Sequence, residues 1–455
     1  MKRSSPRNEA ALRLARRPGT SPRQTARCVA FIGGVLGAAL CGTSASAQIY
    51  TYGQLLDSEI PTTVSTGRNQ GVLDRDRPEL NQVGVPIGGF LALPSITIGQ
   101  GYTDNVVIAE IDKRSDVYAE VKPQLTLQSQ WQRHSLTGTF YYDARRYLNT
   151  GPKNEDGFLA QLDGRLDIQT QSSVFGSASF RRTYENQAEA SFPLGGGGAV
   201  AVDQPRALIR GTTQTNRLRL TVSGDYNGFR YLDTVSTTGV RLNLSFRDRD
   251  VYRTSARAEY LLGKDNSVFT QFTYRRTDYK ATGTVNDRTS DEWRGSVGVI
   301  ADVTDLLRVG GAVGYFHRSY SSPLFRSIGG VVADVHAEYY LSPLTTISAI
   351  VSRELDEATI VGSSGYTDLR IGGRIDHELL RNVLPYVFAD YIHDDFRGID
   401  RVDRAYDAGG GVTYLVNRRF TAQLSAEYVS RSSRGTQSGP NINELRGLIT
   451  ITFHP

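Results

Sequence analysis

The chain has 455 residues, with 52 lysines and arginines against 47 aspartates and glutamates, and contains only two cysteines and one methionine. So few thiols exclude a disulfide framework and a cysteine-based metal site. The formal net charge of +5 comes from the first 27 residues and gives no argument for nucleic-acid binding.

Residues 1–47 have the pattern of a secretory signal. Eight basic residues and one acid lie in residues 1–27, an uncharged and mostly apolar run follows from Cys28 to Cys41, and small residues lead up to Ala47. This order predicts export with cleavage after Ala47. A membrane anchor fits less well, because fourteen apolar residues are too few to span a bilayer. The remaining chain holds 44 basic and 46 acidic residues and is nearly neutral.

Residues 48–87 are polar and rich in turn-forming residues, with Pro61, Pro78 and Pro86 and no long apolar period. We expect this segment to lie in the periplasm, or to fold into the interior of the domain that follows. Its charge run, Asp74-Arg75-Asp76-Arg77, has the appearance of a solvated surface segment.

Residues 88–455 alternate between apolar and polar side chains in one segment after another. In residues 134–148 (HSLTGTFYYDARRYL), Leu136, Phe140 and Tyr142 oppose Thr137, Thr139 and Asp143. Side chains on a strand point to opposite faces with a period of two, so each segment has an apolar face and a polar face. Eighteen such segments begin near residues 88, 116, 133, 156, 172, 204, 218, 250, 266, 290, 305, 328, 344, 366, 382, 403, 419 and 443. The sixth, Pro205 to Gln214, is the least regular, so sixteen strands also fit.

The links between these segments alternate in length. Short turns are expected near Thr170-Gln171 and Thr304-Asp305, and long links at 186–203 and 233–249. Alternating short turns and long loops are typical of bacterial outer-membrane barrels. We therefore predict an all-β, transmembrane, antiparallel up-and-down β-barrel over residues 88–455, in the outer membrane of a Gram-negative bacterium. A soluble sandwich or propeller is the alternative, but its strands would be shorter and would not carry charges on a second face.

Several rising strands end in arginines beside tyrosines. By parity, Arg145, Arg181, Arg275 and Arg318 face the lumen, and we call them the luminal collar. The neighbouring residues Arg146, Arg182, Arg230 and Arg276 form the outer rim. A cationic collar predicts a pore that favours anions, and a cationic rim predicts contact with the phosphates of lipopolysaccharide. Simple interfacial anchoring of the strand ends is the alternative for the rim.

Three short stretches resemble a known family. Residues 71–79 (GVLDRDRPE), 88–95 (GGFLALPS) and 102–106 (YTDNV) are similar to the first-strand region of the putative β-barrel porin 2 type of outer-membrane proteins. The likeness continues through Trp131-Gln132-Arg133-His134 and covers about residues 71–453. It implies an outer-membrane component that accompanies exopolysaccharide or capsule export. The chain departs from the usual aromatic C-terminus, because His454-Pro455 follow Phe453.

Residues that would carry enzyme chemistry are scarce. No P-loop, G-x-S-x-G or H-E-x-x-H motif occurs, and the six histidines lack ligand spacing. His393-Asp394-Asp395 is the one cluster with chemical promise, as a cation site, although a solvated strand end explains it as well. We therefore expect neither an enzyme nor a cofactor.

Two main functions fit these patterns. The first is a component of exopolysaccharide or capsular polysaccharide export, with periplasmic export proteins as partners. The alternative is a diffusion porin for small solutes, and a structural or adhesin barrel is a third idea. Both leading functions need a wet lumen, so the residues alone do not separate them.

Overall fold

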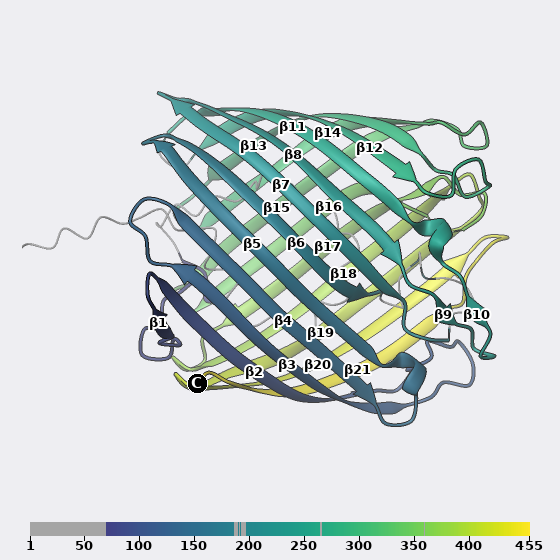
Figure 1. Cartoon of the computed structure of the whole chain (residues 1–455), viewed down its shortest axis with the longest axis horizontal. Helices are drawn as coiled ribbons and strands as arrows, with labels where there is room; N and C mark the ends of the chain where they lie inside the picture. Colours follow the sequence, from purple (N-terminus) through teal and green to yellow (C-terminus); the bar gives the residue numbers. More distant parts are fainter. Residues whose placement is uncertain (1–69, 186–189, 191, 193–196, 264–265, 359) are drawn as a thin grey trace, which may run out of the picture.

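The computed structural model describes residues 70–455 apart from 186–189, 191, 193–196, 264–265 and 359. The expected signal and its cleavage site lie outside the described residues. Eighteen long antiparallel strands form a closed ring, with their axes inclined to the barrel axis (Figure 1). They are β2 (Phe90–Thr103), β3 (Asp116–Ser129), β4 (Ser135–Tyr147), β5 (Glu155–Gln169), β6 (Ser172–Tyr184), β7 (Ala201–Thr215), β8 (Leu218–Tyr231), β11 (Arg249–Leu261), β12 (Ser267–Tyr279), β13 (Ser290–Asp302), β14 (Leu307–Tyr320), β15 (Ile328–Ser342), β16 (Thr345–Asp356), β17 (Gly365–His377), β18 (Val383–Arg397), β19 (Val402–Asn417), β20 (Phe420–Arg434) and β21 (Ile442–Phe453).

The ring closes between its first and last long strands. β2 pairs with β3 on one side and with β21 on the other, where the register runs from Ile96 opposite Phe453 to Thr103 opposite Arg446. The predicted barrel of eighteen strands is therefore confirmed, and the alternative of sixteen is excluded. The uncertain sixth segment is β7, whose ladder to β8 is interrupted at Gln204 and Pro205. Proline lacks the backbone N–H that a ladder requires, which explains the weak sequence pattern there.

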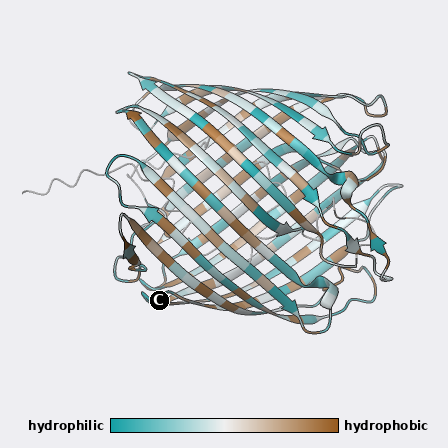
Figure 2. Cartoon of the chain, viewed as in Figure 1, coloured by the Kyte–Doolittle hydropathy of each residue, from teal (hydrophilic) through white to brown (hydrophobic). Residues whose placement is uncertain are grey.

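Hydrophobic and hydrophilic residues alternate along the strands (Figure 2), and the exposed apolar side chains place the apolar set on the outer face. On β8, the side chain of Val222 is 57% exposed on the outside, whereas Thr221 and Ser223 are 5% and 2% exposed and face inward. Every long strand has 12 to 16 residues, and a tilted membrane strand needs only about 9–11. The chain therefore satisfies its backbone hydrogen bonds in a closed ladder, which is how a sheet can cross a bilayer.

The two ends of the barrel differ. Short links such as 170–171, 216–217 and 303–306 lie at one end, and long links such as 232–248, 280–289 and 357–364 lie at the other. The predicted alternation of short turns and long links is therefore present. The C-terminus and β1 lie at the end with the short turns, at the left of Figure 1. We refer to this end as periplasmic and to the other as outer.

Within the described residues, the elements outside the ring are short. β1 (Val85–Ile87) pairs with the start of β2, and β9 (Thr234–Val235) pairs with β10 (Arg241–Leu242) in an outer loop. Two single-turn 3₁₀ helices, η3 (Gly151–Lys153) and η4 (Ser245–Arg247), also lie in outer loops. None of the helices in the described ranges has the length and apolar character to cross a membrane.

Candidate functional site: the lumen and its two mouths

The inner wall carries the polar residues, so the lumen is the candidate site. Its composition follows from strand register, since directly opposed residues in neighbouring strands share a face. Thr139 on β4, for example, lies opposite Thr126 on β3 and Gln161 on β5, and this row continues with Ser179 on β6. Registers of this kind place a polar face on the inner side of every long strand.

Arg145 of the luminal collar is held in a closed ion-pair group. Its guanidinium donates to the carboxylates of Glu120 on β3 and Glu155 on β5, at 3.1 Å each. The Tyr118 ring lies 4.8 Å from the guanidinium carbon. Arg145 is only 8% exposed, so its charge is largely neutralised where it is buried.

Two further collar residues meet at one acid. Glu292 on β13 accepts hydrogen bonds from Arg275 on β12 and from Arg318 on β14, the latter at 2.9 Å. Arg318 also donates to Glu357 in an outer loop at 2.7 Å. Burial alone would raise the pKa of Glu357, but Arg318 and Arg249 outweigh it and lower that pKa. The fourth member, Arg181, donates to the side-chain oxygen of Gln204 at 2.5 Å.

The luminal collar therefore consists of separate groups and does not form one continuous ring. The structure brings Arg275 and Arg318 together, and it leaves Arg145 and Arg181 with different partners on other strands. The alternation along single strands did not identify Glu120, Glu155 and Glu292 as partners of these arginines. Laying neighbouring strands in hairpin register would have revealed them, because Glu120 lies opposite Arg145 and Glu292 opposite Arg275.

The inner wall also separates its charges by sector. The seven adjacent strands from β6 to β14 form a basic sector. On the strands from β6 to β12, eight arginines and two acids face inward. The seven strands β15 to β21 form an acidic sector with twelve inward acids and four arginines. The inward arginines of β6–β12 are Arg181, Arg206, Arg210, Arg219, Arg249, Arg253, Arg257 and Arg275, and the acids are Asp225 and Glu259.

The four outer-rim arginines face the membrane side, and each contacts an aspartate on the next strand. Arg182 donates to both carboxylate oxygens of Asp203, at 2.6 and 2.8 Å, and Arg230 donates to Asp250 at 2.5 Å. The remaining contacts join Arg146 to Asp156 and Arg276 to Asp291. Tyrosine hydroxyls donate to three of the same carboxylates, from Tyr142, Tyr226 and Tyr274. The rim is therefore a band of alternating charge and is not purely cationic.

Outer loops pack inward over the barrel mouth. Val200 and Leu244 from two loops join Val202, Phe229 and Val251 of the wall in an apolar cluster. Beside this cluster, Glu185 and Arg247 form a buried ion pair, and the Arg247 guanidinium carbon lies 4.0 Å from the centre of the Tyr231 ring. Burial raises the pKa of the Glu185 carboxyl, and Arg247 opposes that rise.

Ala190, from the link between β6 and β7, packs with Tyr366 of β17 and Phe396 of β18, which lie on a distant part of the wall. Its carbonyl accepts a hydrogen bond from Arg401 at 3.3 Å. The outer mouth is therefore narrowed by loop residues held on both sides.

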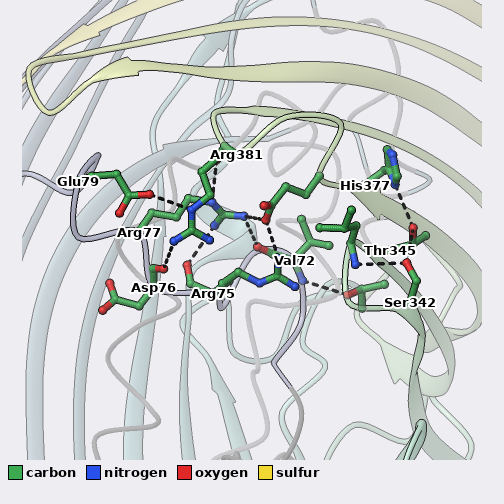
Figure 3. Close-up of polar contacts among 12 residues, drawn as sticks. Val72, Arg75, Asp76, Arg77, Glu79, Ser342, Thr345, His377 and Arg381 are labelled. Atoms are coloured by element: carbon green, nitrogen blue, oxygen red, sulfur yellow. Dashed lines mark hydrogen bonds and ion pairs between the residues drawn. The ribbon is translucent and has the colours of Figure 1, made fainter.

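At the periplasmic end, residues 71–81 dock against the foot of the acidic sector (Figure 3). Arg77 donates to Glu378 at 2.8 Å and to the carbonyl of Val72 at 2.9 Å, and Arg75 donates to the same carboxylate at 2.9 Å. The backbone N–H of Val72 donates to the Thr346 hydroxyl at 3.0 Å. The expectation of a solvated run is wrong for Arg77, which is 4% exposed, because Glu378 from a link 301 residues away neutralises it.

The described residues gather no constellation typical of catalysis. His393 and Asp394 point to opposite faces of β18, so the His393-Asp394-Asp395 cluster does not converge on one point. No group of three or more potential metal ligands occurs within the described ranges. What the wall offers is a set of polar and charged side chains that face the inside of a closed ring of strands.

Comparison with known proteins gives a family and a set of barrels. A family model described as putative beta-barrel porin 2 matches residues 77–454. No protein of curated function matches the sequence. Among solved structures, OpdK of Pseudomonas aeruginosa with vanillate is similar at 9% identity and a TM-score of 0.46, over 80% of this chain and 99% of that one. OpdL of the same organism is similar at 12% identity and a TM-score of 0.42, over 81% of this chain and 99% of that one. The FrpB iron transporter of Neisseria meningitidis is similar at 8% identity and a TM-score of 0.44, over 77% of this chain and 64% of that one.

Proposed function

Because the chain belongs to the putative beta-barrel porin 2 family, we propose that it is an outer-membrane diffusion porin for small hydrophilic solutes. The observation that carries the proposal is the polar and charged inner face on all eighteen strands. A ring of this size is wide enough to hold an aqueous channel. Side chains such as Thr139, Gln161 and Ser179 can replace part of a solute's hydration shell during passage.

The two mouths set a size limit on that solute. Residues 71–81 cover part of the periplasmic mouth, and the contact of Ala190 with Arg401 narrows the outer one. Constrictions at both ends favour small molecules over a polymer chain. This arrangement supports the porin over the export function that the family resemblance implies.

The test is conductance and solute flux. Purified, folded protein should give stepwise currents in planar bilayers, and should admit a neutral sugar such as arabinose to liposomes. Folding is checked independently by the heat-dependent shift in electrophoretic mobility of the barrel. A folded protein that passes neither ions nor arabinose would refute the proposal.

A second observation separates the two functions in cells. If gene deletion abolished surface polysaccharide and left small-solute uptake unchanged, the barrel would be an export component, and the porin proposal would be replaced. Loss of uptake with normal surface polysaccharide is the expected outcome.

A further inference from the structure

Two opposite parts of the inner wall carry opposite charge at overlapping depths. Counting around the ring from β2, β7 is the sixth long strand and β18 the fifteenth, so nine strands, half of the circumference, separate them. β7 has two inward arginines, Arg206 and Arg210, and no inward acid. β18 has two inward acids, Asp390 and Asp394, and no inward base.

The depths of these four residues overlap. β7 descends from the outer end, and Arg206 and Arg210 are its sixth and tenth residues. β18 rises, so Asp394 and Asp390 are the fourth and eighth residues counted from its outer end. A solute near the middle of the passage therefore has guanidinium groups on one side and carboxylates on the other.

The acidic side extends over several strands. Glu354, Asp368, Asp394 and Asp403 lie directly opposite one another on β16, β17, β18 and β19. Asp390 likewise lies opposite Asp407. Like charges at directly opposed positions destabilise a sheet, so this arrangement does not serve the stability of the barrel.

The basic side also has like charges at directly opposed positions. Arg253 on β11 lies directly opposite Arg275 on β12. Asp225 accepts from Arg253 at 2.9 Å, and Gln271, a neutral partner, accepts from Arg257 at 2.9 Å. The eight inward arginines of β6–β12 share two inward acids of the same strands, and Glu292 of β13 accepts from Arg275, so this sector keeps an excess of arginines.

Opposed charged walls produce an electric field across the passage. Low-dielectric walls focus such a field, and a solute that carries both charges can align with it. A simple anion is attracted by one wall and repelled by the other, and the same holds for a simple cation. Only a molecule with a separated anionic and cationic group gains from both walls.

We propose that the lumen selects small zwitterionic solutes. This inference rests on the proposed porin function and names the class of solute. The anionic group of the solute faces Arg206 and Arg210, and its cationic group faces Asp390 and Asp394. This replaces the anion preference expected from the luminal collar, because acids on neighbouring strands offset three of those four arginines.

Swelling of proteoliposomes tests the proposal with two solutes of similar size. Glycine betaine is zwitterionic at every practical pH, and erythritol is neutral. At low salt, betaine should enter wild-type vesicles about tenfold faster than erythritol, which is at the lower end of what field focusing produces. Salt should reduce the ratio, since the screening length falls to about 8 Å at physiological ionic strength.

Two double variants remove one wall each. Arg206→Gln with Arg210→Gln, and Asp390→Asn with Asp394→Asn, should each bring the betaine-to-erythritol ratio close to one. In bilayers, the first should shift the reversal potential toward cation selectivity and the second toward anion selectivity. Arg182→Gln with Asp203→Asn, a membrane-facing pair, is the matched control and should change neither quantity.

The outcomes separate this inference from the porin function. Erythritol flux with a wild-type ratio near one would refute zwitterion selection and leave the porin intact. Absence of erythritol flux in folded protein would refute the porin itself. An unchanged ratio in both double variants would show that these four charges do not act on the solute.

Discussion

Replacing Leu162 by arginine should impair the barrel strongly, whereas the same replacement at Gln161 should be tolerated. Leu162 is the eighth of the fifteen residues of β5, so it lies near the bilayer midplane, and its side chain is 52% exposed toward lipid. Gln161 is its neighbour in sequence but faces the lumen, where its amide donates to Asp163 at 2.7 Å.

The expected magnitude follows from that geometry. A lipid-facing arginine at the midplane of a barrel costs about 2–4 kcal/mol. Because 1.4 kcal/mol is a factor of ten, the folding equilibrium should fall about 30-fold to 700-fold. At Gln161, an arginine would lie in the wet lumen beside Asp163, so the cost should be small.

Urea titration of both variants in lipid vesicles measures the difference, with wild type as reference and electrophoretic mobility as the check of folding. Leu162→Arg should lower the free energy of unfolding by the stated amount, and Gln161→Arg should leave it nearly unchanged. Equal losses at the two positions would mean that the strand faces are assigned incorrectly.

Three further predictions concern the mouths and the loops. Glu378→Gln removes the carboxylate that holds Arg77, so residues 71–81 should detach and single-channel conductance should rise; unchanged conductance would mean that this segment does not restrict flow. Burial lowers the pKa of Lys153 from 10.5 to about 8. Between pH 8 and 10.5 the unfolded chain therefore binds more protons than the folded chain, so the free energy of unfolding should rise with pH over about this range. Lys153→Met should abolish that rise in urea titrations across this range, and a rise that persists would assign it to another group. Cysteine at Thr237, exposed in a long link, should react with an impermeant reagent on intact cells, whereas cysteine at Asp305 in a short turn should not; the reverse pattern would invert the topology.

Sequence alternation was enough to predict the barrel because parity and strand length are local properties. The predicted start at residue 218 and the predicted start at residue 290 coincide with those of β8 and β13. β7 was hard to delimit, since Pro205 breaks its ladder and arginines interrupt its pattern.

The partners of the charged residues were not predicted, because they depend on contacts between distant segments. Arg77 meets Glu378 only after the ring has closed, and Arg318 meets Glu357 only where a loop folds over the wall. The charged sectors, in contrast, were accessible in principle. Parity combined with hairpin register would have shown that Asp390 lies opposite Asp407 and that Arg253 lies opposite Arg275.

The pairing of β2 with β21 has a consequence for the order of assembly. Most ladders join strands that are neighbours in sequence, but the hydroxyls of Thr97 and Thr452, which hydrogen-bond across this seam, are 355 residues apart. β21 follows every other strand of the ring in the sequence, so the seam can form only after all eighteen strands have been synthesised. Contacts between remote segments form slowly, because the entropy of the intervening chain must be lost first. We therefore expect closure of this seam to be the slow step, and substitutions along it should delay the appearance of folded barrel more than equivalent substitutions in a hairpin such as β7–β8.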